Sequence, residues 1–243
     1  KYIRASPASG TEIRRLADSL PGVRILGGPA VLDDPLAGCY DMVARRDASA
    51  LVFDLLRGER DSHRWRSLEE WNRWMILGAK VATRHPDFPQ PLIAEIETYR
   101  GCFRYRSGGC SFCVEPLKGA VSAREPQDII QEVEALRSLG VRNFRLGGQT
   151  CIISYEADPD SGDPPRPNPD AIEELFSGIS SLGAGILHVD NANPAVIAEY
   201  PEESTAILRT LVRYCTSGNV LALGMESADP RVIEMNNLNA TPQ

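Results

Sequence analysis

From residue 92 onward, short apolar runs alternate with longer stretches in which apolar residues recur every three or four positions. The short runs predict β-strands, and the longer stretches predict helices that each bury one face. The predicted strands cover residues 92–97, 143–146, 186–189 and 220–223. The predicted helices cover residues 126–139, 169–179 and 202–214, and a further helix begins near Pro230. This alternation predicts an α/β fold with parallel strands, in which four units of a partial (βα) barrel fit before Gln243.

A weaker pattern of the same kind precedes this region. Residues 11–20 have helical spacing, and residues 23–29 form an apolar run that ends in a glycine turn. Residues 40–43 then predict a weak strand and residues 48–56 a helix. This order predicts part of a doubly wound, Rossmann-like α/β domain. Residues 68–83 then predict a helix with a broad apolar face, which a proline-rich run ends. The three predicted regions, a partial α/β domain, a helix with a linker, and the first part of a barrel, cover residues 1–66, 67–91 and 92–243.

The composition is that of a globular protein, with 42% hydrophobic and 24% charged residues. A net charge of -7 argues against a broad binding surface for nucleic acid or for an anionic membrane. No apolar run reaches the ~18 residues of a membrane span, and the N-terminus lacks the layout of a signal peptide. We therefore expect a cytoplasmic protein without a membrane partner.

Three of the six cysteines, Cys102, Cys110 and Cys113, fall within twelve residues, whereas the others stand alone. Thiols clustered in this way in a reducing compartment indicate metal or redox chemistry. Their thiolates could bind a zinc ion or an iron–sulfur cluster. A closed zinc site needs a fourth ligand, for which Cys151 is the candidate. Three thiolates on a four-iron cluster would instead leave one iron open to a small molecule.

The predicted barrel strands end in glycine or polar residues, at 99–102, 147–150, 190–194 and 224–227. Ligands of parallel α/β sheets collect at the carboxyl ends of the strands, so these endings predict one site. The Gly108-Gly109 pair suits a loop that wraps around a cluster, because backbone donors can then approach its sulfurs closely. The composition of residues 158–167 forbids helix and sheet and predicts a solvent loop or a lid.

The loop that ends in Cys110-Ser111-Phe112-Cys113 resembles the cluster loop of the radical S-adenosylmethionine (SAM) superfamily, and the resemblance covers residues 92–243. It implies an enzyme that reductively cleaves SAM to a 5′-deoxyadenosyl radical, which abstracts hydrogen from a substrate. Cys102, Cys110 and Cys113 would ligate a 4Fe-4S cluster, and SAM would chelate the fourth iron. An electron donor such as ferredoxin or flavodoxin would be a partner. The competing interpretation is an iron–sulfur electron-transfer or binding protein without SAM chemistry.

The resemblance also implies contacts to SAM. Phe112 would line the adenine pocket, and Glu226 would contact the ribose. The segment Gly147-Gly148-Gln149 resembles the family's glycine-glycine-glutamate segment, which meets the SAM amino group. Two features depart from the family pattern. The spacing is C-x7-C-x2-C where C-x3-C-x2-C is commonest, and Gln149 replaces Glu, which makes the amino-group contact uncharged.

Several segments are similar to those of an archaeal branch of the superfamily whose members carry a C-terminal helix-hairpin-helix segment. They cover residues 100–102, 108–116, 144–147, 190–194, 226–230 and 236–239. A helix-hairpin-helix generally presents backbone amides to phosphates, so this likeness implies a nucleic acid, in particular RNA, as the substrate of the intact protein. A small molecule or a protein side chain is the competing substrate class.

The N-terminal region resembles the end of the cobalamin-binding-type domain that precedes many radical SAM barrels, through Gly27-Gly28-Pro29 and residues 41–56. Cobalamin is thus a candidate cofactor, but the chain has no D-x-H-x-x-G motif to support it. A purely structural α/β layer is the alternative for this region.

The remaining residues that could carry chemistry have simpler interpretations. We interpret His63, His85 and His188 as structural and Trp71 and Trp74 as packing residues. Cys39 and Cys215 are interpreted as buried small hydrophobic residues. The arginines around the cysteine loop would either offset the charge of a cluster or lie at the surface, and they are Arg100, Arg104 and Arg106.

Overall fold

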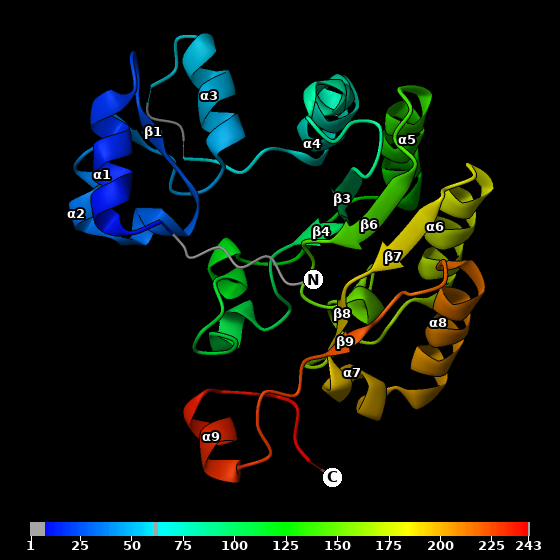
Figure 1. Ribbon diagram of the computed structural model, residues 1–243. Coiled ribbons are helices and arrows are strands. Elements are labelled where there is room, and N and C mark those ends of the chain that lie inside the picture. Colours follow the sequence, from blue (N-terminus) through cyan, green and yellow to red (C-terminus); the bar gives the residue numbers. More distant parts are fainter. Residues whose placement is uncertain (1–7, 61–62, 243) are drawn as a thin grey trace. The chain divides into compact units, whose positions relative to one another are not determined.

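The computed structural model describes residues 8–60 and 63–242, and it divides into two compact units between Ser67 and Leu68. Figure 1 labels the elements of both units.

The first unit is a small α/β arrangement around one parallel strand pair. Strand β1 (Ile25–Leu26) pairs with β2 (Met42–Val43), and a core of Leu26, Val31 and Leu36 packs beside them. The predicted strand at 23–29 is shorter than expected because Gly28 adopts a φ of +70° and Pro29 follows it, which turns the chain into a 3₁₀ helix. The helices of this unit are α1 (Gly10–Ser19), η1 (Gly28–Leu32), α2 (Asp34–Ala37) and α3 (Ala48–Leu56).

The second unit is built on three parallel strands. They are β3 (Ile93–Glu97), β6 (Asn143–Gly147) and β7 (Ile186–Val189), in the order β3-β6-β7. Helices α5 (Pro126–Ser138), α6 (Pro169–Ser181) and α8 (Pro201–Tyr214) pack side by side along one face (Figure 1). The parallel strands with crossover helices confirm the mixed α/β class predicted from the sequence.

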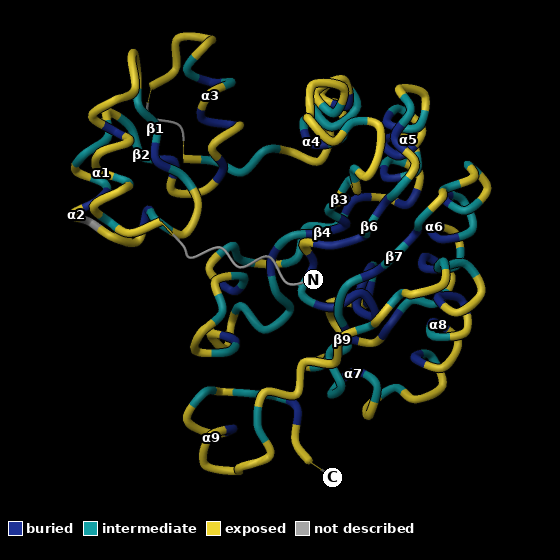
Figure 2. The backbone as a smooth tube through the Cα atoms, viewed as in Figure 1, coloured by how far each residue is buried: buried dark blue, intermediate teal, exposed yellow. Residues whose placement is uncertain are grey.

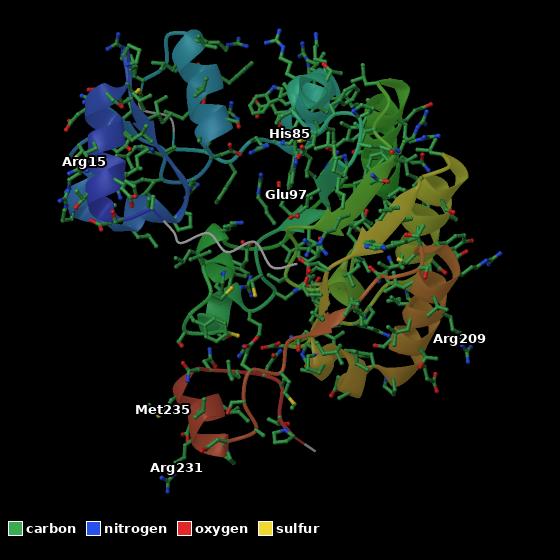
Figure 3. The ribbon with its side chains drawn as sticks, in the orientation of Figure 1. Arg15, His85, Glu97, Arg209, Arg231 and Met235 are labelled. Atoms are coloured by element: carbon green, nitrogen blue, oxygen red, sulfur yellow. The ribbon has the colours of Figure 1, made fainter. Side chains whose placement is uncertain are left out.

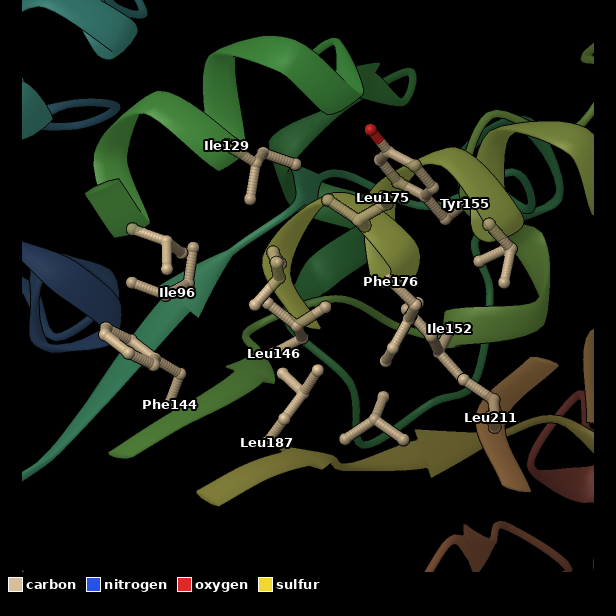
Figure 4. Packing of buried hydrophobic residues seen from close by; sticks show 14 of the residues in the cluster. Ile96, Ile129, Phe144, Leu146, Ile152, Tyr155, Leu175, Phe176, Leu187 and Leu211 are labelled. Carbon is tan, nitrogen blue, oxygen red and sulfur yellow. The ribbon is translucent and has the colours of Figure 1, made fainter. Parts of the chain in front are cut away.

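The two faces of this sheet differ in chemistry because successive strand residues point to opposite sides. Ile96, Phe144, Leu146 and Leu187 are buried against the helices, where Figure 4 shows them packed with residues of α5 and α6, and Figure 2 shows the buried core along these elements. The other face carries charge. Arg145 pairs with Glu95, with 3.7 Å between Nη1 and Oε2, and with Asp190 just beyond β7.

Helix α4 (Leu68–Gly78) begins the second unit and continues as a 3₁₀ helix, η2 (Ala79–Arg84). A fully buried Arg124 joins α4 to α5. Its Nε lies 2.7 Å from Asn72 Oδ1 on α4, and its Nη1 lies 2.5 Å from Glu132 Oε2 on α5. The same Nη1 also donates to the carbonyl of Glu97 at 3.1 Å, and Glu97 lies at the carboxyl edge of the sheet (Figure 3).

The fourth predicted strand differs from expectation. Strand β9 (Ala222–Leu223) is shorter than the predicted run and pairs with β8 (Asn191–Ala192), which follows β7 after a break at Asp190. The structure also contains elements that the sequence pattern did not predict. These are the antiparallel pair β4 (Tyr99–Arg100) and β5 (Ser122–Ala123), helix α7 (Pro194–Glu199), and the 3₁₀ turns η3 (Tyr105–Ser107), η4 (Glu115–Lys118) and η5 (Ile152–Ser154).

The final helix, α9 (Pro230–Met235), begins at the predicted Pro230. Arg231 and Met235 extend outward from it, as Arg209 does from α8 (Figure 3). None of the helices in the described parts of the chain combines the length and the apolar character that a membrane crossing requires.

Candidate iron–sulfur site

A cavity of about 490 Å³ lies where the strands of the second unit end, and we call it the cysteine cavity. Its walls come from the loops after β3, β6, β7 and β9 and from the segment after α9. Seven of the eight predicted site residues line it, namely Cys102, Cys110, Phe112, Cys113, Gly148, Gln149 and Glu226. Gly147 does not; it is buried, and a Cβ on it would lie 2.8 Å from Glu95 Oε1.

The cysteine loop (residues 102–113) is shaped by left-handed glycines. Gly108 and Gly109 have φ values of +83° and +62°, which L-residues with a Cβ rarely adopt. Gly109 is also packed closely, since a Cβ there would lie 2.3 Å from Pro116 Cγ. The Cys113 amide donates to the Cys110 carbonyl at 3.0 Å, which closes the tight turn between these two cysteines.

Two of the three thiols receive hydrogen bonds from the same residue. The Arg104 amide donates to Cys102 Sγ at 3.4 Å, and Arg104 Nη1 lies 3.7 Å from Cys110 Sγ. Burial raises the pKa of both thiols, and Arg104 opposes that rise. Partly buried thiols with cationic and amide donors suit metal ligation, because the thiolate form is the ligand.

In the segment after β6 that is predicted to meet SAM, the Gln149 side chain makes internal hydrogen bonds. The Gln149 side chain is 5% exposed. Its Oε1 accepts from Thr98 Oγ1 at 3.2 Å and its Nε2 donates to the Leu146 carbonyl at 3.3 Å. Both ends of the amide are therefore used to join the ends of β3 and β6. Phe112, in contrast, is 61% exposed and Glu226 is also exposed, so their side chains are accessible.

The asparagine-rich segment after α9, residues 236–239, closes over the cysteine loop. Asn237 Nδ2 donates to the carbonyls of Ser107 and Gly109 at 2.9 and 2.8 Å, and Ser111 Oγ donates to Asn236 Oδ1 at 2.6 Å. Asn237 has a φ of +49°, a conformation in which asparagine is enriched. The asparagine run was visible in the sequence, but nothing local to it indicated which loop it would bind.

The loop predicted as a solvent loop or a lid lies against the cavity. Asp163, Pro164 and Pro165 line it, and Asp163 Oδ2 accepts from Arg104 Nε at 3.0 Å. The loop is attached at its far end through Arg166 and Glu203, at 2.8 Å. Its position is that of a lid over the cysteine loop.

A fourth thiol, Cys151, also lines the cavity and is buried. Its Sγ accepts from the Asn193 amide at 3.2 Å, and its backbone amide and carbonyl are bound by the buried Tyr99 hydroxyl at 2.8 and 2.7 Å. Cys39 and Cys215 are half-buried, so the prediction that both are buried small hydrophobic residues holds only in part. Burial still raises the pKa of Cys215 to about 11.

The donor set fits an iron–sulfur cluster in its chemistry. Across residues 8–60 and 63–242, no three His, Cys, Asp or Glu side chains converge closely enough to hold one metal ion. In a 4Fe-4S cluster each thiolate binds a different iron, so the three sulfurs need only surround a common volume. Soft thiol ligands on a glycine-containing loop with backbone donors have the chemistry that such a cluster needs.

Comparison with known proteins gives two long archaeal relatives. No protein-family model matches the sequence. An uncharacterized protein of Methanocaldococcus jannaschii is 43% identical over an alignment of 263 residues. The alignment covers 100% of this chain and 48% of that protein. An uncharacterized protein of Archaeoglobus fulgidus is 48% identical over 174 residues, 71% of this chain and 32% of its own length. The chain therefore spans about half, or less, of the length of these relatives.

Two more distant likenesses are to enzymes. A tRNA-2-methylthio-N(6)-dimethylallyladenosine synthase of Psychrobacter arcticus is 31% identical over 108 residues, 42% of this chain and 21% of that enzyme. Among solved structures, the cobalamin-dependent S-adenosylmethionine radical enzyme OxsB, with aqua-cobalamin and SAM bound, superposes with a TM-score of 0.55. The likeness covers 89% of this chain and 33% of that enzyme, at 12% identity. The chain thus shares an α/β fold with part of a radical SAM enzyme.

Proposed function

We propose that this protein is a radical SAM iron–sulfur enzyme whose second unit is part of a (βα) barrel. The observation that carries the proposal is the placement of Cys102, Cys110 and Cys113 on one loop in a cavity at the carboxyl ends of parallel strands. The fold shared with a cobalamin-dependent SAM radical enzyme supports it independently of the cysteine spacing.

In this proposal the three cysteine thiolates hold a 4Fe-4S cluster and leave one iron for SAM. When bound, the cluster and SAM supply a 5′-deoxyadenosyl radical by reductive cleavage. Phe112 offers an accessible aromatic face for the adenine, and the Glu226 carboxylate accepts hydrogen bonds from the ribose hydroxyls.

The protein's other contributions are to position SAM and to exclude water. The segment Gly147-Gly148-Gln149 presents its backbone to SAM, because the Gln149 side chain is used in internal hydrogen bonds. The lid residues Pro164 and Pro165 cover part of the cavity with apolar surface. Exclusion of water protects a reactive radical from side reactions.

The proposal also includes a substrate, an electron donor and a second cofactor. We propose RNA as the substrate class, which the partial likeness to a tRNA-modifying synthase supports. Ferredoxin or flavodoxin would supply the electron in the cytoplasm. Cobalamin remains a candidate second cofactor, supported by its presence in the similar solved structure.

The test is anaerobic reconstitution with iron and sulfide, followed by dithionite and SAM. We expect a 4Fe-4S absorption band and release of 5′-deoxyadenosine and methionine. Replacement of any one of Cys102, Cys110 or Cys113 by Ala should abolish both, because a three-thiolate site that loses one ligand cannot retain the intact cluster.

Matched controls use the thiols outside the loop. Cys39→Ala, Cys215→Ala and Cys151→Ala should retain the band. A reducible cluster that leaves SAM intact would favour the electron-transfer interpretation, and a cluster retained in Cys102→Ala would contradict the ligand assignment.

A further inference from the structure

We propose that Arg104 raises the reduction potential of the cluster held by the cysteine loop, and that Asp163 on the lid moderates this effect. The inference rests on the proposed function, since it concerns the same cluster. Arg104 contacts the cysteine ligands and would not bind the cluster itself, so it is a positioning and tuning residue.

Arg104 reaches the sulfurs from two directions. Its backbone amide donates to Cys102 Sγ at 3.4 Å, and its guanidinium Nη1 lies 3.7 Å from Cys110 Sγ. One residue thus supplies a dipole to one ligand and a full positive charge to another. Hydrogen bonds to the sulfurs and nearby charge are among the factors that set the potential of an iron–sulfur cluster.

The guanidinium is held in place by two other segments of the chain. Its Nε donates to Asp163 Oδ2 at 3.0 Å, and its Nη1 and Nη2 donate to the Asn237 carbonyl and Oδ1 at 2.7 and 3.2 Å. The side chain is only 11% exposed. A fixed, desolvated cation interacts with a neighbouring charge more strongly than a solvated one.

The sign of the effect follows from the charge that reduction adds. One electron makes the cluster and its thiolates more negative, so a fixed positive charge and sulfur hydrogen bonds stabilise the reduced form. Asp163 lies on the other side of the same guanidinium and offsets part of its charge. Removing Arg104 should therefore lower the potential, whereas neutralising Asp163 should raise it.

Arg106 provides a matched control on the same loop. It is exposed, its guanidinium lies over the Tyr105 ring at 5.5 Å from the centroid, and its Nε donates to the Tyr105 hydroxyl at 2.9 Å. Arg106→Met removes the same formal charge two positions away. A general effect of net charge would move the potential equally in Arg104→Met and Arg106→Met.

The experiment is an anaerobic redox titration of the reconstituted protein, followed by the electron paramagnetic resonance signal of the reduced cluster. Iron and sulfide content is measured in each variant first. In Arg104→Met we expect the equilibrium constant for one-electron reduction to fall about tenfold, a shift of about 59 mV to lower potential. Asp163→Asn should shift the midpoint upward, Arg104→Lys should recover part of the loss, and Arg106→Met should match the wild type.

The outcomes separate this inference from the proposed function. Equal midpoints in wild type, Arg104→Met and Asp163→Asn, at equal cluster content, would overturn the tuning role while leaving the cluster in place. An equal shift in Arg106→Met would also overturn it. If Arg104→Met fails to hold a cluster, Asp163→Asn and Arg104→Lys decide the sign. A wild-type protein that binds no iron would overturn both proposals.

Discussion

Gly101 is the residue at which the chain leaves β4 and enters the cysteine loop. Its φ is +88°, and a Cβ built there would lie 2.5 Å from the Ala120 carbonyl oxygen and 2.8 Å from that of Gly119. The next amide, of Cys102, donates to the Gly119 carbonyl at 3.2 Å. Gly108 has a similar φ of +83°, but a Cβ there meets nothing within 4 Å. Both glycines therefore have a left-handed backbone, but only at Gly101 would an added Cβ also collide with neighbouring atoms.

We expect Gly101→Ala to destabilise the second unit more than Gly108→Ala. Gly108→Ala costs only the left-handed backbone, about 1–2 kcal/mol. Gly101→Ala must in addition move the backbone at 119–120 and weaken the hydrogen bond that anchors Cys102. Urea denaturation followed by circular dichroism measures the difference. Equal losses of stability would contradict the close approach seen at Gly101.

At the scale of residues, the clustering of the three cysteines is visible in the sequence, whereas the contacts that surround them are not. The three thiols are recognisable because their chemistry and spacing are local to one loop. The contacts of Arg104 with Asp163 and Asn237 span 59 and 133 positions of the chain, so only the fold brings them together. The same holds for Gln149, whose partner Thr98 lies 51 positions away.

At the scale of elements, a single carboxylate caps the N-terminus of helix α3 in the first unit. Asp47 is its N-cap, and its Oδ1 accepts from the amides of Ser49 and Ala50 at 2.9 and 3.2 Å. Arg66 donates to the same carboxylate from Nη2 at 3.2 Å. Burial alone would raise the pKa of Asp47, but the hydrogen bonds and charge of Arg66, with the backbone donor of Ala50, outweigh it and hold that pKa below its ordinary value.

A lowered folded-state pKa makes Asp47 a source of acid sensitivity. Its contribution is present above the unfolded pKa of about 3.9 and is lost as the pH falls through the lower folded value. We expect the protection of α3 amides against hydrogen exchange, corrected for intrinsic rates, to fall as the pH decreases from about 5 to about 3 in the wild type. In Asp47→Asn the protection should be lower at pH 7 and nearly independent of pH.

The exposed carboxylate of Glu59 supplies the control. Glu59→Gln removes one charge from the same unit without removing a helix cap. It should retain both the protection and the pH dependence of the wild type. If Glu59→Gln abolishes the pH dependence as Asp47→Asn does, the acid sensitivity comes from the net charge of the unit and not from the helix cap.

Among the elements, the main helices and the central strands were predictable from the hydrophobic pattern, whereas several of the shortest elements were not. The bounds predicted for α3 and β7 agree with the structure, and those of α5 and α8 differ by one residue at one end. Helix α7 is six residues long, too short to show a helical period. The pairing of β9 with β8 depends on the break at Asp190, which leaves no trace in the hydrophobic pattern.

At the scale of the whole molecule, charge constrains the proposed RNA substrate. The chain carries 26 Lys and Arg residues against 33 Asp and Glu residues. The cysteine cavity itself is lined by Glu95, Glu115, Asp163, Asp190 and Glu226. Phosphate contacts require Lys, Arg or free backbone donors, so this chain should not hold an RNA backbone strongly. The relative from Methanocaldococcus jannaschii is about twice as long, because the aligned region is 48% of it.

The substrate proposal therefore predicts a difference between this chain and that longer relative. We expect the relative to bind tRNA or rRNA with an affinity that falls about a thousandfold between about 50 and 200 mM salt, as about six phosphate contacts would require. This chain alone should bind weakly at every salt concentration. Fluorescence anisotropy with labelled tRNA measures both, and a neutral polymer of equal size controls for nonspecific association. If the longer protein shows no salt-sensitive binding to RNA or DNA, the phosphate contacts that the RNA proposal requires are missing, and a small-molecule or protein substrate becomes the better hypothesis for the same cavity.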